Sequence, residues 1–299
     1  MTIQMEHDDS PVFSRNQWDL AFVGDHLDDR GTEAAKYVNS VAKSVMKIVY
    51  SANEFEFIID GNTVSIDDLP KHLSQYINGS ILLEATTMGF VEILTVLNAL
   101  KIAGSTSFSI LYLEPGGYKR KSKSLVMHRR EFDLSGEVLG YKAIPGFSKI
   151  LSDEIDQQVV FFVGFESSRL DRAMEDYQMI NPKQCVVVFG VPAFKSGWEI
   201  DSFANNIGTM NDRKISGGIH YCGANNPLSA YVALEEIKSG IQKNESMFVA
   251  PIGTKPTSIG TALFAINNPN IGVLYDHPTK DRGRTKEILS WNLYNIEIN

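Results

Sequence analysis

Two short turns in this 299-residue sequence carry residue types that can hold a phosphate. Thr86 and Thr87 follow one apolar run, and Gly253, Thr254 and Lys255 follow another. Hydroxyl groups, the backbone N–H groups at the start of a helix and one ammonium group together suit a bound anion. The sequence contains no GxxxxGK[ST] phosphate loop. We therefore expect an anion site at these turns that differs from a Walker site.

Glycine directly follows an apolar run at two further turns, where it lets a backbone approach a ligand. Gly24 is followed by Asp25, and Gly164 is followed by Glu166 two positions later. Arg169 begins the next helix-like segment, and its charge favours an anion at that helix N-terminus. Two other interpretations stay open. The glycines can serve tight turns alone, and Arg169 can pair with a neighbouring acidic side chain.

Matched spacings indicate an internal duplication. Residues at a separation of 163 agree in type in five pairs: Tyr112 and Tyr275, Pro115 and Pro278, Lys119 and Arg282, Lys121 and Arg284, Lys123 and Lys286. At a separation of 140, Phe22 to Gly24 matches Phe162 to Gly164. The matched cations, Lys119, Lys121, Arg282 and Arg284, are candidates for ligand contact, and the alternative is solvated surface charge.

Short apolar runs alternate with helix-length segments along the chain, which is typical of parallel α/β sheets. We expect two tandem Rossmann-like units related by the duplication, one over 18–140 and the other over 156–299. Residues 1–17 are expected to be a loose leader. The stretch 192–226 is rich in Gly and Asn and is expected to be a long loop that acts as a lid or binding loop.

The composition narrows the function class. The formal charge of −8 argues against general nucleic-acid binding. No apolar run reaches the length of a membrane span, and the polar start of the chain is unlike a secretory signal, so we expect a cytoplasmic protein without membrane contact. No metal or cofactor motif occurs, and no catalytic motif was found. Glu84, Glu114 and Asp276 remain candidates for a general base because they lie at expected strand ends.

The segment VAPIGTKPTSIGTAL, followed by an apolar run that ends in a tyrosine, resembles the ligand turn of CARF domains. These are Rossmann-like sensors of cyclic oligonucleotides in prokaryotic defence. Two such units in one chain resemble the plan of the SAVED domain. The resemblance implies that Thr86, Thr87, Thr254 and Lys255 contact the ligand. It also implies that Gly24 and Gly164 lie beneath the ligand and that a separate effector responds to binding.

Three functions follow as hypotheses. The first is a pseudo-symmetric sensor of a phosphate-bearing nucleotide that acts with an effector protein or as a homo-oligomer. The second is an enzyme that processes a nucleotide or nucleoside with the same turns. The third is an interaction subunit of a larger assembly, in which the basic loops contact an acidic partner.

Overall fold

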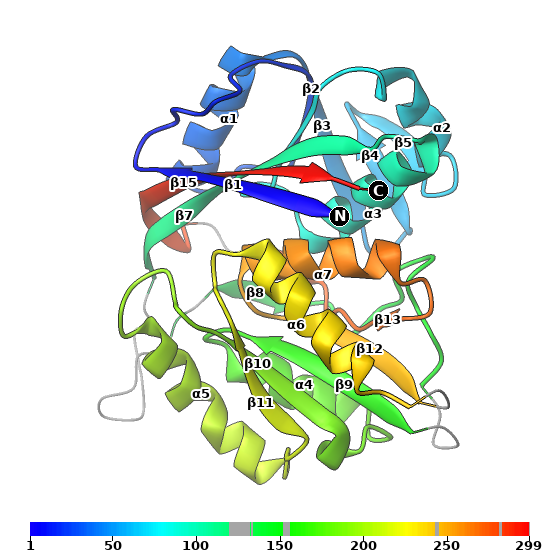
Figure 1. Cartoon of the computed structure of the whole chain (residues 1–299), viewed down its shortest axis with the longest axis vertical. Helices are drawn as coiled ribbons and strands as arrows, with labels where there is room; N and C mark the ends of the chain where they lie inside the picture. The colour runs from blue at the N-terminus through cyan, green and yellow to red at the C-terminus, as the bar shows by residue number, and fades with distance from the viewer. Residues whose placement is uncertain (120–131, 133, 152–155, 243–244, 281–282, 299) are drawn as a thin grey trace. The chain divides into compact units, whose positions relative to one another are not determined.

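The computed structural model describes residues 1–119, 132, 134–151, 156–242, 245–280 and 283–298. These residues form a mixed α/β structure, as the sequence predicts (Figure 1). Contacts divide the chain into two compact units. Unit 1 holds Met1–Tyr118 and Arg282–Asn299, and unit 2 holds Lys119–Asp281. The boundaries differ from the expected 18–140 and 156–299, because the last strand pairs within unit 1.

Unit 1 contains a mixed eight-stranded sheet in the order β1-β15-β7-β6-β2-β3-β4-β5. The four strands β3, β2, β6 and β7 are parallel, and antiparallel strands extend the sheet at both sides. The strands are β1 Thr2–Asp8, β2 Trp18–Val23, β3 Ala42–Ser51, β4 Glu56–Ile59, β5 Asn62–Ser65, β6 Ile81–Glu84, β7 Ser107–Tyr118 and β15 Thr285–Glu297.

The helices of unit 1 begin and end at recognisable sequence signals. Helix α1 (Asp29–Val41) starts at Asp28, whose carboxylate accepts the Gly31 N–H. Helix α2 (Leu69–Leu73) continues as a 3₁₀ turn over Ser74–Tyr76. Helix α3 (Phe90–Ala103) is apolar around most of its circumference and ends at Gly104, which has a φ of 97°.

Unit 2 contains a parallel five-stranded sheet in the order β11-β10-β9-β12-β13. Numbered along the chain, this order is 3-2-1-4-5, which is Rossmann-like. The strands are β9 Gln157–Val163, β10 Cys185–Gly190, β11 Gly218–Cys222, β12 Ser246–Pro251 and β13 Gly272–Val273. The helices are α4 Ser167–Asp176, α5 Trp198–Asp212, α6 Pro227–Ser239 and α7 Lys255–Asn267, with a 3₁₀ turn at Pro182–Gln184. Strands β8 (Ser135–Val138) and β14 (Pro278–Lys280) form a separate antiparallel pair.

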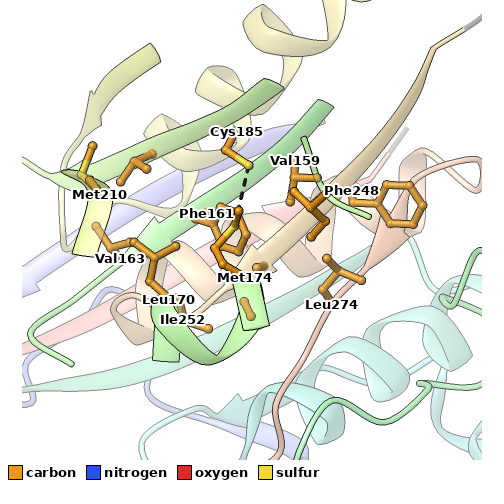
Figure 2. Close-up of a cluster of buried hydrophobic side chains, with 14 of the residues drawn as sticks. Val159, Phe161, Val163, Leu170, Met174, Cys185, Met210, Phe248, Ile252 and Leu274 are labelled. Carbon is orange, nitrogen blue, oxygen red and sulfur yellow. Dashed lines mark hydrogen bonds between the residues drawn. The ribbon is translucent and has the colours of Figure 1, made fainter. Parts of the chain in front are cut away.

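Both faces of the unit 2 sheet are buried, which explains why its strands are continuous apolar runs. Val159, Phe161 and Val163 of β9 point into one cluster, while Val160 and Phe162 point into the other. Figure 2 shows the first cluster, in which the Cys185 thiol lies 3.9 Å from the sulfur of Met174. Burial raises the pKa of the Cys185 thiol to about 12, so this cysteine is a core residue.

Two expected irregular segments are ordered strands and helices. The expected leader 1–17 contains β1, which pairs with β15 along its whole length. The expected long loop 192–226 contains helix α5 and strand β11. Strand β1 has polar residues along its length, so the sequence contains no apolar run that would predict it. Helix α5 was missed because its buried side includes Ser202, Asn205 and Asn206, while Ile200 is 68% exposed. This reverses the usual amphipathic pattern.

The two sheets share a strand order. The order β3-β2-β6-β7 in unit 1 corresponds to β10-β9-β12-β13 in unit 2. One row across unit 1 is Phe22, Leu83 and Ile110. In unit 2 the row that starts at Phe162 continues to Pro251, and the row two residues earlier in β12, at Val249, continues to Val273. The described pairs of β13 end at Val273, so the match of Tyr112 with Tyr275 stays a prediction.

The two turn glycines differ in the space around them, and this gives a matched test. A Cβ atom on Gly24 would lie 2.3 Å from the backbone oxygen of Thr87, whereas the nearest atom to a Cβ on Gly164 is the Ile252 oxygen at 3.6 Å. We expect Gly24→Ala to lower the free energy of unfolding by about 1–3 kcal/mol, because backbone must move. Gly164→Ala should stay within about 0.5 kcal/mol of the wild type. Urea denaturation measures both, and equal effects would contradict the packing role of Gly24.

Candidate functional site

In a parallel sheet whose strand order reverses, ligands bind at the carboxyl edge beside the reversal. In unit 2 the reversal lies between β9 and β12, because β10 and β11 extend to one side and β13 to the other. The β9–α4 turn carries Gly164 and Glu166, and the β12–α7 turn carries Gly253, Thr254 and Lys255. The fold therefore brings five predicted site residues to one edge of this sheet.

Polar side chains of α5 fix the β9–α4 turn. The Ser202 hydroxyl and the Asn206 amide both donate to the Gly164 carbonyl oxygen at 2.8 Å. The Asn205 amide donates to the Phe165 carbonyl at 3.2 Å. These positioning residues were missed from the sequence, although the spacing of 202, 205 and 206 matches one face of a helix.

The carboxylate of Glu166 is turned toward the chain segment before it. It accepts the backbone N–H of Ser135 at 2.9 Å, the Ser135 hydroxyl at 2.8 Å and the Leu134 N–H at 3.2 Å. Glu166 thus anchors the start of β8 to the first turn of α4. This role differs from the expected ligand contact.

Arg169 forms a buried ion pair with Asp276, beyond the end of β13. Its Nε donates to one carboxylate oxygen at 2.7 Å, and its Nη2 donates to the other at 2.5 Å. Nη1 donates to the carbonyl oxygen of Ile252 at 3.4 Å. Burial alone would lower the pKa of Arg169, but the charge of Asp276 outweighs it and raises that pKa. Arg169 thus pairs within the protein, but its partner is the distant Asp276 rather than a neighbouring acidic side chain on an exposed helix face.

The β12–α7 turn combines a capped helix with a lysine. Thr254 is the N-cap of α7, and its hydroxyl accepts the Thr257 N–H at 3.4 Å while donating to the Ala224 carbonyl at 2.6 Å. Lys255 is the first residue of the helix and is half-buried. The partial positive charge at the helix start and the Lys255 ammonium group both favour an anion. The Thr254 hydroxyl serves the fold, so Lys255 is the strongest candidate for ligand contact in this turn.

The corresponding turn of unit 1 already holds an anion of its own. The side chain of Glu84 accepts the N–H of Thr86 at 2.7 Å, the N–H of Thr87 at 2.9 Å and the Thr87 hydroxyl. The Thr87 hydroxyl oxygen also accepts the N–H of Gly24 at 2.8 Å, and that of Thr86 accepts the Leu113 N–H at 3.0 Å. The donors expected to hold a phosphate are therefore engaged by a buried carboxylate.

Of the remaining predicted residues, Lys119 and Arg284 adjoin Tyr118 and Thr285, the last pair of β7 and β15. Asp25 forms an ion pair with Lys47 of β3 at 2.6 Å. Lys119 follows β7 and is exposed, and Arg284 precedes β15 and is half-buried. Lys121 and Arg282 lie outside the described residues. In the part of the chain that the structure describes, no group of acidic, His or Cys side chains is arranged to hold a metal ion. None of the described helices combines the length and apolarity that a bilayer crossing requires.

The buried Arg169–Asp276 pair predicts a large effect of removing one partner. Asp276→Asn leaves a buried guanidinium without its counter-charge, so the free energy of unfolding should fall by about 3–5 kcal/mol. The double variant Arg169→Met/Asp276→Leu should lose less than Asp276→Asn alone. Asp171→Asn is the control, since its pair with Arg213 is partly exposed and should contribute at most about 1 kcal/mol. Guanidinium denaturation gives the values, and a loss for Asp276→Asn no larger than the control would contradict the assignment.

Replacing Glu84 tests whether the turn after β6 depends on the buried Glu84 carboxylate. Glu84→Gln puts an amide donor against backbone N–H donors, and we expect a loss of about 1–3 kcal/mol in the free energy of unfolding. Glu33→Gln, at an exposed pair with Lys36, should change it by less than about 0.5 kcal/mol. Thermal and urea unfolding of both variants provide the comparison. A neutral Glu84→Gln would mean that the turn does not depend on the carboxylate.

Comparison of the sequence with protein-family models finds no match, and comparison with curated proteins finds none either. The function must therefore be argued from the chemistry of the site, because one α/β architecture serves many activities.

Proposed function

We propose that the chain is a binding protein for a phosphate-bearing nucleotide, with the phosphate held at the β12–α7 turn of unit 2. One observation carries the proposal: the strand order of unit 2 places the start of α7, with Lys255 as its first residue, beside the reversal of the sheet. A helix N-terminus and an ammonium group at that position match the charge of a phosphate.

The carboxylates near the strand ends favour binding over catalysis. Asp276 is paired with Arg169, and Glu84 accepts three hydrogen bonds from its own turn. Glu166 is likewise held by Ser135 and Leu134. A general base needs an oxygen that can reach the substrate proton. Asp276 and Glu84, two of the three candidate bases, thus act as structural acceptors, as Glu166 does, so we place ligand recognition ahead of nucleotide processing. Glu114 stays a candidate base.

The resemblance to CARF and SAVED domains supports a cyclic oligonucleotide as the nucleotide and a separate effector protein as the partner in antiviral defence. The shared strand order of the two sheets supports a common origin by duplication. The β6–α3 and β12–α7 turns have diverged, since the N–H groups of the β6–α3 turn donate to the Glu84 carboxylate. We therefore propose that the phosphate binds the turn of unit 2. Contact by Lys119, Lys121, Arg282 and Arg284 stays a prediction.

Thermal unfolding with mononucleotides, dinucleotides and cyclic oligonucleotides tests the proposal. A ligand at one hundred times its dissociation constant should stabilise the protein by about 2.7 kcal/mol. Lys255→Ala should abolish the shift, while Lys183→Ala, which removes an exposed lysine of the same unit, should leave it unchanged. Mass spectrometry of the incubated nucleotide distinguishes binding from turnover. The proposal fails if no nucleotide shifts the unfolding temperature, or if both lysine variants respond like the wild type.

A further inference from the structure

Arg30 in the first turn of α1 is a buried cation. Its exposed fraction is 5%, and no carboxylate of the described residues lies within ion-pair distance of it. Removing a guanidinium group from water costs several kcal/mol unless an anion or several hydrogen bonds compensate. In the sequence, a single arginine after a turn gives no indication of its burial.

The hydrogen bonds of Arg30 occupy one side of its guanidinium group. Nη1 donates to the carbonyl oxygen of Leu113 at 2.6 Å and to the Tyr112 hydroxyl at 3.3 Å. The guanidinium carbon lies 5.6 Å from the centre of the Tyr112 ring. Nε is buried without a hydrogen-bond partner, and Nη2 makes no hydrogen bond to a described residue. The edge formed by Nε and Nη2 is the edge that binds an oxyanion with two parallel hydrogen bonds.

Unit 2 provides an internal comparison. Arg169 also lies in the first turn of the helix that follows the first parallel strand of its sheet, and its Nη1 also donates to a backbone carbonyl. There the Nε and Nη2 edge is filled by Asp276. Among the described residues of unit 1, no carboxylate bonds to the corresponding edge of Arg30. Unit 1 thus has the arginine without its built-in carboxylate.

The acidic side chains near Arg30 do not pair with it. Arg284 is a second cation nearby, because it directly precedes Thr285, whose hydroxyl donates to the Asp28 carboxylate at the start of α1. The carboxylate of Asp28 accepts the N–H of Gly31 at 2.8 Å and the Thr285 hydroxyl, so it caps α1. Glu114 is the other acidic side chain nearby. Burial is the main cause that raises the pKa of the Tyr112 phenol, and the charge of Glu114 also raises it. Neither carboxylate is bonded to Arg30.

We propose that unit 1 binds an oxyanion, a phosphate or a carboxylate group of a small molecule, at the Nε and Nη2 edge of Arg30, with Arg284 as the second cation. The bound group takes the part that Asp276 plays for Arg169. The start of α1 adds a favourable partial charge. This site is separate from the one proposed at Lys255 and does not depend on it.

Thermal unfolding in sodium phosphate, sodium acetate and sodium chloride at equal ionic strength tests the site. We expect a saturable stabilisation by phosphate or acetate over chloride. The anion that acts identifies the class of ligand group. Arg30→Lys keeps a positive charge but loses the two-pronged edge, and the apparent affinity should fall about tenfold or more. Arg284→Gln should weaken binding to a smaller extent.

Two controls keep the result interpretable. Arg213→Met removes an arginine from a partly exposed pair in unit 2 and should leave the anion response unchanged. Lys255→Ala should keep the response to inorganic phosphate while losing the response to nucleotides, so the two proposals can fail separately. Each variant is compared with its own chloride baseline, which removes any loss of stability from the comparison. An equal response in wild type, Arg30→Lys and Arg213→Met, or no response in wild type, would overturn the inference.

Discussion

The carboxyl edge of unit 2 depends on the buried contact between Arg169 and Asp276. One guanidinium group joins the first turn of α4, the carbonyl of Ile252 after β12 and the carboxylate after β13. It therefore holds three successive parts of the edge around the reversal of the sheet. The Ser202 and Asn206 contacts to Gly164 complete this frame from α5. Lys255 therefore lies in a turn that is linked, through the Ile252 carbonyl, to α4 and to the segment after β13.

The two units satisfy buried charges by different means. Unit 1 places the carboxylate of Glu84 in its β6–α3 turn, and unit 2 has Ile252 at the corresponding place in the ladder (84 + 168 = 252, the offset of Leu83 and Pro251). Conversely, unit 2 supplies Asp276 to its arginine, whereas the described residues of unit 1 supply a carbonyl and a phenol to Arg30. Because desolvated charges need partners, we propose that each unit accepts an external anion where the other has an internal one.

The sequence predicts the buried parallel strands and most helices, because continuous apolar runs and N-caps such as Asn226 are local signals. It fails where structure depends on distant residues. Strand β1 is polar and becomes a strand only by pairing with β15. The buried face of α5 is polar because it binds carbonyl groups of another turn. For the site, residue type indicates Lys255 and Arg169 as cations, but their partners follow from tertiary contacts that no spacing reveals.

The pairing of Tyr118 with Thr285 has a topological consequence. These residues face each other across β7 and β15 as the two ends of a hairpin do, and the whole of unit 2 occupies the position of the hairpin loop. In the sequence, unit 2 is thus an insertion between two parts of unit 1. During synthesis, β7 emerges long before its neighbour β15, so unit 2 has the opportunity to fold while the sheet of unit 1 is still incomplete. Closing that long loop costs less entropy once a folded unit 2 spans it.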